Sequence, residues 1–290
     1  MKHPKVFLLI IFLITVFVSG TLYAKDSDFY LKKVWESGKV FKTPESVWYD
    51  KKTDALYISN INGSPSKKDN NGFISKVSTQ GKIIKLKWAT GLSSPKGLCT
   101  YKNRLYVTDV DRIAEIDLNS GKIIKFYKVE DAIFLNDIAA DSSGTLYFSD
   151  TSGKNSAVYR LKDGKIEKWL DKSMVKNPNG LYSTKSVLYV GSSGEKKIKI
   201  FDIKTKKVLG EVYVGTGIDG LIPFKNFGFI TSNWAGKTLF VSTKGKITVL
   251  LDTTKEKINS ADLGFVYSKN LLIIPTFYDN RIIAYKVLPR

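Results

Sequence analysis

The segment from Asn136 to Asp150 reads NDIAADSSGTLYFSD: a short apolar strand around Ile138, a few turn residues, and a second strand that begins with Leu146-Tyr147-Phe148. Related units recur about every forty residues, which is the period of a β-propeller blade. The second strands have Leu-Tyr-aliphatic triplets at 56–58, 105–107, 146–148 and 188–190, with weaker copies at 227–229 and 271–273. Each first strand has one apolar anchor residue: Val47, Leu98, Ile138, Leu181, Leu221 and Leu263.

Two further strands follow in most copies. Alternating apolar residues, as in 198–201, are typical of half-buried third strands, and tight turns such as 119–121 lead into fourth strands. The last copy ends near Val287 with three strands, and we expect Leu31–Val34 to supply the fourth, because closing the ring leaves no open sheet edge. The predicted fold is therefore all-β: a six-bladed β-propeller, formed by residues 25–290 as one domain.

The N-terminus, residues 1–24, has the pattern of a secretory signal peptide. Lys2 and Lys5 precede an apolar run from Val6 to Val18, and small residues follow up to Ala24. A retained membrane anchor is the alternative, but a membrane span needs about 20 apolar residues and this run is shorter. We therefore expect an exported protein, periplasmic or secreted, which is a monomer without a transmembrane span in its mature form.

The composition excludes several kinds of site. The one histidine, His3, lies in the expected signal peptide, so the mature chain cannot form a Ser-His-Asp triad or a His-ligated zinc site. The one cysteine, Cys99, stands in an apolar stretch, where a buried hydrophobic role is expected. The formal net charge is +19, with lysines spread along the chain. This pattern favours solvated strand faces and attraction to anionic envelope surfaces, and no nucleic-acid partner is expected.

Equivalent positions two residues before each anchor form a second pattern. A propeller places them at the start of its innermost strands, around one mouth of the central channel. A mixed set of carboxylates and amides there suits a hard divalent cation: calcium first, with magnesium or manganese also possible. Asn and Asp are also frequent turn residues, which is the alternative explanation. The six positions are Glu45, Lys96, Asn136, Asn179, Asp219 and Ala261.

The ends of the second strands lie at this same mouth, because neighbouring strands are antiparallel. The loops there present Trp234 and Tyr278, together with polar residues such as Asp109 and Asp150, so this is the expected substrate face. The segment from Ile61 to Gly72 is the longest of these loops. A lid over the site and a disordered insertion are both compatible with its polar composition.

The motifs around these positions resemble the senescence marker protein/gluconolactonase/luciferin-regenerating-enzyme family. The similar segments are 44–48, 136–150, 178–181 and 219–220, which follow one another across nearly the whole mature chain. Members of this family are six-bladed propellers that hydrolyse lactones and related esters with calcium or another divalent metal. The resemblance implies that Glu45, Asn136, Asn179 and Asp219 hold the metal, and that Asn136 and Asp137 line the substrate pocket.

Two positions depart from the family pattern. Phe134 stands where members acting on sugar lactones tend to have Arg, which argues against a polyhydroxylated sugar lactone as the substrate. Lys96 places a cation at the same channel mouth, where it would either repel a metal or hold an anionic group of a substrate.

Two functions remain open at this stage. The first is metal-assisted hydrolysis of a small lactone or ester, with Asp219, Glu45 or Asp137 as the catalytic group that takes a proton from water. The second is a non-catalytic exported propeller that binds a small anionic ligand, a glycan or a peptide, since a fold alone does not decide function. In either case the residues expected to contact the small molecule are Lys96, Phe134, Asn136, Trp234 and Tyr278.

Overall fold

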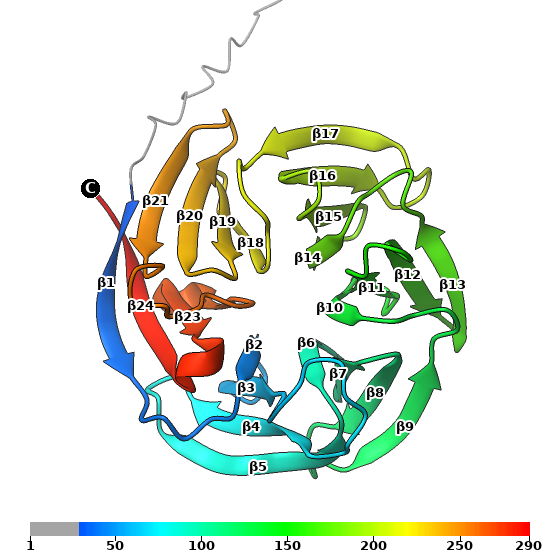
Figure 1. Ribbon diagram of the computed structural model, residues 1–290, viewed down its shortest axis with the longest axis horizontal. Coiled ribbons are helices and arrows are strands. Elements are labelled where there is room, and N and C mark those ends of the chain that lie inside the picture. Colours follow the sequence, from blue (N-terminus) through cyan, green and yellow to red (C-terminus); the bar gives the residue numbers. More distant parts are fainter. Residues whose placement is uncertain (1–28) are drawn as a thin grey trace, which may run out of the picture.

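Six antiparallel sheets of four strands are arranged radially around a central channel in the computed structural model, which describes residues 29–290 (Figure 1). Each sheet is one blade, and in blades 1 to 5 the chain runs strand by strand from the channel to the rim. The predicted six-bladed propeller is confirmed. The expected signal peptide, residues 1–24, lies outside the described residues.

The strand bounds follow the sequence repeat. Blade 1 consists of β2 (Pro44–Asp50), β3 (Ala55–Asn60), β4 (Gly72–Ser78) and β5 (Ile83–Leu92). Blade 2 consists of β6 (Pro95–Tyr101), β7 (Arg104–Asp109), β8 (Arg112–Asp117) and β9 (Ile123–Lys128). Blade 3 consists of β10 (Leu135–Ala140), β11 (Leu146–Asp150), β12 (Ala157–Lys162) and β13 (Lys165–Leu170).

The second half of the ring repeats this arrangement. Blade 4 consists of β14 (Pro178–Ser183), β15 (Val187–Ser192), β16 (Lys197–Asp202) and β17 (Val208–Tyr213). Blade 5 consists of β18 (Leu221–Phe224), β19 (Gly228–Asn233), β20 (Lys237–Ser242) and β21 (Ile247–Asp252). Blade 6 contains β22 (Gly264–Val266), the 3-10 helix η1 (Tyr267–Lys269), β23 (Leu271–Pro275), the 3-10 helix η2 (Phe277–Asp279) and β24 (Ile282–Pro289).

The N-terminal strand β1 (Phe29–Glu36) completes blade 6. It pairs antiparallel with β24, from Phe29 opposite Pro289 to Glu36 opposite Ile283. Phe29 is buried, and its ring packs against Phe224 and Phe240 of blade 5 with centroid distances of 5.1 and 4.9 Å. The two ends of the described chain therefore close the ring, as the sequence predicted.

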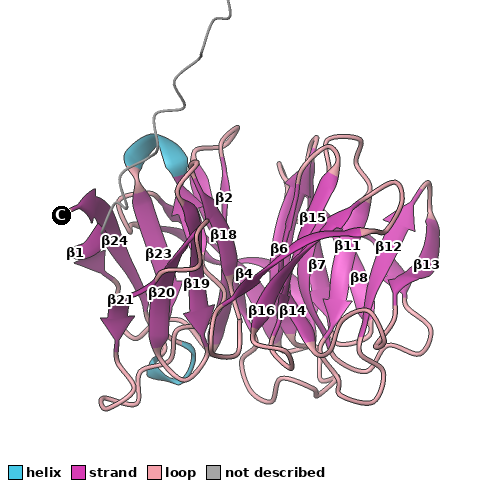
Figure 2. Cartoon of the chain, turned by 90° about the horizontal axis from the view of Figure 1, so that it is seen from above, coloured by secondary structure: helices cyan, strands magenta, loops and turns pink. Residues whose placement is uncertain are grey.

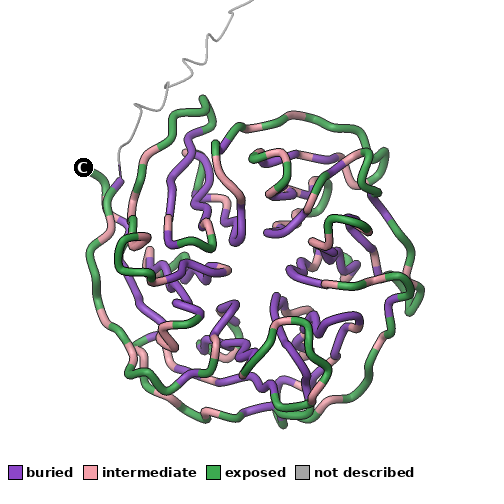
Figure 3. Tube along the Cα trace, in the orientation of Figure 1, coloured by how far each residue is buried: buried purple, intermediate pink, exposed green. Residues whose placement is uncertain are grey.

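The hydrophobic core lies between neighbouring blades. Second strands such as β3 are buried along their whole length, because both of their faces pack against adjacent sheets. Outermost strands such as β9 have mostly exposed side chains. Figure 3 shows this gradient from the buried inner strands to the exposed rim. Cys99 is buried within the core, as expected.

All six innermost strands run in the same direction along the channel, so the disc has two distinct faces. We call the face where these strands begin the ring face, and the opposite face, with the hairpins between first and second strands, the far face. The two 3-10 helices lie on opposite faces of the disc (Figure 2). Within residues 29–290, no helix has the length and apolar character that a membrane span requires.

Candidate functional site

A β-bulge stands at the start of the innermost strand in blades 1 to 4. The register between the first and second strands shifts beside the predicted ring residue in each of these blades. A bulge leaves a residue unpaired and re-aims its side chain. Hydroxyl groups of the second strand replace lost ladder bonds: Ser59 Oγ accepts from the Ser46 N–H at 2.9 Å, and Ser149 Oγ accepts from the Asp137 N–H at 3.0 Å. The second strand thus fixes the backbone that presents the ring.

The predicted ring residues are all buried, with exposed fractions of 8% or less. Asn179 Nδ2 donates a hydrogen bond to Asp219 Oδ1 at 2.7 Å, which joins blades 4 and 5. Glu45 Oε2 and Asp219 Oδ2 have no hydrogen-bond partner in the described structure. Buried polar atoms without partners are rare in folded proteins, so these two oxygens mark a place where a proton, a cation or a substrate group binds.

The pKa values of the ring carboxylates also indicate a place where a proton or a cation binds. Burial raises the pKa of Glu45 well above its ordinary value, the nearby Asp219 carboxylate raises it further, and Lys96 opposes this rise. Burial also raises the pKa of Asp219 to about 7, against the hydrogen bond from Asn179. Two buried carboxylates without enough counter-charge favour either protonation or a bound cation.

A metal at this ring would need the amides as well as the carboxylates. The described residues contain no group of three or more His, Cys, Asp or Glu side chains suited to hold a metal ion. Asn136 and Asn179 supply the remaining side-chain oxygens, and both are buried beside the channel. The donor set is therefore composed of two carboxylates and two amides, which suits a hard cation such as calcium.

Lys96 and Phe134, the two departures from the family pattern, contact each other. The Lys96 ammonium lies 4.4 Å from the centroid of the Phe134 ring, a cation–π arrangement. Its Nζ also donates to the backbone oxygen of Ser94 at 3.2 Å. Burial lowers the pKa of Lys96 to about 8, while Glu45 raises it. Lys96 is thus a buried cation at the ring that forms no salt bridge with any residue from 29 to 290.

Aromatic side chains gather at the ring face over blades 5 and 6. The rings of Trp234 and Tyr278 are 5.8 Å apart, and both pack edge-on against Phe277. Trp234 is 43% exposed and Tyr278 is 62% exposed, whereas Phe277 is buried against Ile61 and Ala261. Phe277 has a φ of 47°, an unfavourable left-handed conformation for a bulky residue. The structure thus brings together Trp234 and Tyr278, two of the three aromatic residues predicted to contact a ligand.

The long loop of blade 1, residues 61–71, contacts blade 2. Ser94 Oγ donates to the Ser64 oxygen at 2.7 Å, and Lys68 forms an ion pair with Asp111 at 2.5 Å. Figure 1 shows this loop crossing from β3 toward β6 and β7. These contacts place the loop beside the ring face, against blade 2.

Polar residues at the ends of the second strands hold the blade linkers. Asp109 accepts hydrogen bonds from the backbone N–H groups of Ser93 and Ser94, at 2.9 and 2.7 Å, and forms an ion pair with Arg112. Asp150 accepts a hydrogen bond from a linker N–H in the same way. The oxygens of these residues are occupied within the protein, so their role at the ring face is structural.

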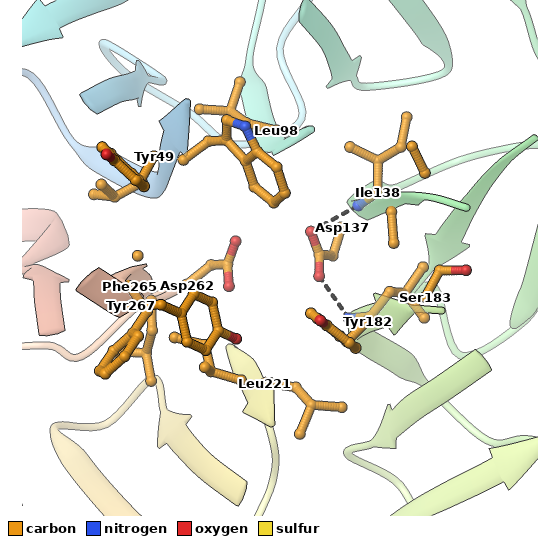
Figure 4. Close-up of a pocket in the computed structure, with 18 of the residues that line it drawn as sticks. Tyr49, Leu98, Asp137, Ile138, Tyr182, Ser183, Leu221, Asp262, Phe265 and Tyr267 are labelled. Carbon is orange, nitrogen blue, oxygen red and sulfur yellow. Dashed lines mark hydrogen bonds between the residues drawn. The ribbon is translucent and has the colours of Figure 1, made fainter. Parts of the chain in front are cut away.

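Asp137 lies one level deeper in the channel than the ring. Its Oδ1 accepts from the Ile138 N–H at 2.6 Å and its Oδ2 from the Leu181 N–H at 2.5 Å, so it connects blades 3 and 4. Burial raises its pKa to about 7 in spite of these bonds. Across the channel lies Asp262, whose Oδ2 accepts from Ser46 Oγ at 2.5 Å (Figure 4).

Asp262 was missed by the sequence analysis. Burial and the nearby Asp137 carboxylate raise its pKa well above the ordinary value. A signal existed, because Asp262 and Asp137 each stand one residue before an anchor, Leu263 and Ile138. Comparing that position between blades would have paired the two carboxylates.

Several solved structures superpose on this chain. A protein classed as a gluconolactonase superposes with a TM-score of 0.65 at 15% identity, covering 90% of this chain and 93% of that one. Luciferin-regenerating enzyme gives 0.62 at 16% identity, covering 90% and 95%. Virginiamycin B lyase from Staphylococcus aureus gives 0.62 at 14% identity, covering 90% and 100%. At such identities these structures show a shared fold alone.

Sequence comparison gives the family. A search of curated protein sequences finds no match. The model of the SMP-30/gluconolactonase/LRE-like region matches residues 43–221, which is more than half of the chain and contains the four oxygen-bearing ring residues. The chain therefore belongs to the SMP-30/gluconolactonase/LRE-like family.

Proposed function

We propose that this protein is an exported, divalent-metal-dependent hydrolase of a lactone or related ester, with calcium as the metal. The observation that carries the proposal is the pair of buried, unpartnered oxygens, Glu45 Oε2 and Asp219 Oδ2, beside the amides of Asn136 and Asn179. Four oxygen donors from four blades fit a hard cation, whose charge would also offset the repulsion between the carboxylates.

The chemistry divides between the cation and the side chains. When bound, the cation would polarise the carbonyl of a lactone or ester and stabilise the charge that develops on its oxygen. Glu45 and Asp219 each have an unpartnered oxygen that can accept a proton from water. Asp137 is the least suited of the predicted bases, because both of its oxygens already accept backbone hydrogen bonds. Its proposed role is to position the backbone next to Asn136.

The substrate class follows from the other side chains at the ring face. Trp234 and Tyr278 offer exposed aromatic surface for an apolar body. Phe134 adds an aromatic ring, and Lys96 offers a cation to an anionic group. An aromatic or aliphatic lactone or ester that carries an acidic group fits this set better than a polyhydroxylated sugar lactone.

Calcium titration of residues 25–290 by calorimetry tests the metal site. Glu45→Gln and Asp219→Asn, made together, should abolish binding, whereas the exposed Asp163→Asn should not. A screen of lactones and aryl esters, with and without a chelator, then tests hydrolysis. Calcium binding that persists in the double variant would contradict the proposed ligands, and no chelator-sensitive hydrolysis in the whole screen would contradict the proposed reaction.

One observation favours a second function. Lys96 is a fully buried cation at the ring, and it could supply the counter-charge that a metal would otherwise supply. In that case the ring face would bind a small anionic ligand, a glycan or a peptide without catalysis. The absence of calcium binding by the unmodified protein would favour this function.

Export and assembly are also proposals. Cleavage after Ala24 is tested by N-terminal sequencing of the protein recovered outside the cytoplasm. A monomer that associates with anionic envelope surfaces through its positive charge is tested by light scattering and by salt-dependent release from vesicles containing anionic lipid.

A further inference from the structure

A cavity occupies the end of the channel opposite the ring face. It has a volume of about 360 Å³, and its lining extends from Asp137 and Asp262 to residues at the far-face ends of the first strands, such as Tyr49 and Ser183 (Figure 4). Its wall is formed by one aliphatic anchor residue from each blade: Val47, Leu98, Ile138, Leu181, Leu221 and Leu263. A space of this size and apolar character is typical of small-molecule sites.

Aromatic side chains surround the outer part of this cavity. Tyr49, Tyr182, Phe265 and Tyr267 line it, and the rings of Phe265 and Tyr267 pack edge to face at 4.9 Å (Figure 4). Aromatic faces attract organic cations as well as apolar groups. The outer part of the cavity therefore suits a ligand that carries both a positive charge and an apolar group.

The inner end of the cavity is acidic. Asp137 belongs to blade 3 and Asp262 is next to β22 of blade 6, and these blades are opposite each other in a ring of six. Their carboxylates consequently face each other across the channel (Figure 4). Asp262 accepts a bond from Ser46 through Oδ2, but its Oδ1 has no hydrogen bond within residues 29–290. Neither Asp137 nor Asp262 forms a salt bridge in that part of the chain.

We propose that this cavity binds a small organic amine, with its ammonium group at Asp262 and its apolar body against the aliphatic wall. An ammonium group supplies the positive charge that the acidic end lacks, and it can donate to the free Asp262 oxygen in a charge-assisted hydrogen bond. None of the four proposed metal ligands lines this cavity.

An anionic amphiphile is the competing ligand. Lys51 is exposed at the rim and could meet an acidic headgroup there. The tail of such a ligand would then end against two carboxylates, where burial of apolar groups leaves polar atoms without partners. The acidic inner end therefore favours entry with an ammonium group first.

A matched ligand series tests the proposal. Calorimetry on residues 25–290 would compare 2-phenylethylamine, 2-phenylethanol and 3-phenylpropanoate, which share a phenyl group and differ in charge. We expect the amine to bind at least about tenfold more tightly than the alcohol, and the carboxylate to bind more weakly than both. Asp262→Asn should bring the amine and the alcohol to within about twofold of each other. The control Asp163→Asn removes an exposed carboxylate from the turn between β12 and β13, outside the cavity lining, and should leave the preference unchanged.

A second variant locates the site without relying on Asp262. Ser183 lines the cavity, and Ser183→Trp should fill its mouth and weaken binding of both the amine and the alcohol by at least about tenfold, with circular dichroism confirming the fold. Equal affinity for amine and alcohol, tighter binding of the carboxylate, no binding at millimolar concentrations, or unchanged binding in Ser183→Trp would each overturn the proposal.

Discussion

Replacing Asp219 by Asn should stabilise the calcium-free protein at pH 8. The charged Asp219 is buried with one unpartnered oxygen, which raises its pKa from the ordinary 3.8 to about 7. Asn has nearly the same shape, and its side-chain oxygen can still accept the bond from Asn179. The substitution thus removes a buried charge while it keeps the packing and the link between blades 4 and 5.

The size of the effect follows from the pKa difference. One pKa unit corresponds to about 1.4 kcal/mol, so the rise from 3.8 to about 7 corresponds to roughly 4 kcal/mol at pH 8. Because the folded state binds this proton more tightly than the unfolded state, the stabilising contribution is present below about pH 4 and is lost as pH rises through 7. The variant should therefore melt roughly 10 °C higher than the unmodified protein at pH 8, and at nearly the same temperature at pH 4.

Thermal unfolding followed by circular dichroism, in a chelating buffer at both pH values, provides the measurement. Calcium should reverse the order of the two melting temperatures at pH 8, because calcium stabilises the folded state only of a protein that keeps its calcium-binding side chains. Asp163→Asn, which changes an exposed carboxylate, controls for the change in net charge. If Asp219→Asn melts lower than the unmodified protein at pH 8 without calcium, the buried charge of Asp219 does not destabilise the folded state. The reasoning for the metal site is then refuted.

Two further substitutions test the ring and its closure. Lys96→Met should raise calcium affinity at least about tenfold in calorimetry, because a buried cation beside Glu45 opposes a second cation; unchanged affinity would mean that Lys96 does not act on the site. Phe29→Ala should lower the free energy of unfolding by about 3–5 kcal/mol in urea denaturation, because its ring is buried against Phe224 and Phe240; a loss below about 1 kcal/mol would show that β1 contributes little to ring closure.

The fold could be predicted largely from the sequence because each blade repeats the same physical problem. A propeller blade buries its first and second strands, so anchors such as Ile138 and triplets such as 146–148 must be apolar in every copy. The weakest copy shows the limit of this signal. Blade 5 has Gly228 in place of the usual Tyr, yet it still pairs Ile222 with Ile230. The pairing of β1 with β24 followed from the strand count alone.

The site was less predictable because side-chain oxygens serve two purposes in this fold. Asp109 and Asp219 look alike in sequence, each at a strand end near the channel. Asp109 accepts hydrogen bonds from two linker N–H groups and forms an ion pair with an arginine, whereas Asp219 keeps an unpartnered oxygen. That difference depends on which loop returns to which strand, and no local pattern encodes it. The cavity at the far face has the same origin, since its walls are anchors that a sequence identifies only as core.

Two glycines mark the level between the ring and the far-face cavity. Gly97 and Gly180 stand one residue before their anchors, at the level of Asp137 and Asp262. A Cβ atom at Gly97 would lie 2.5 Å from the Asp137 Cα, and one at Gly180 would lie 2.5 Å from the Asp219 backbone oxygen. Glycine is therefore required where neighbouring inner strands approach most closely. On one side of this level lie the oxygen donors of the ring, and on the other side aliphatic and aromatic groups line the far-face cavity.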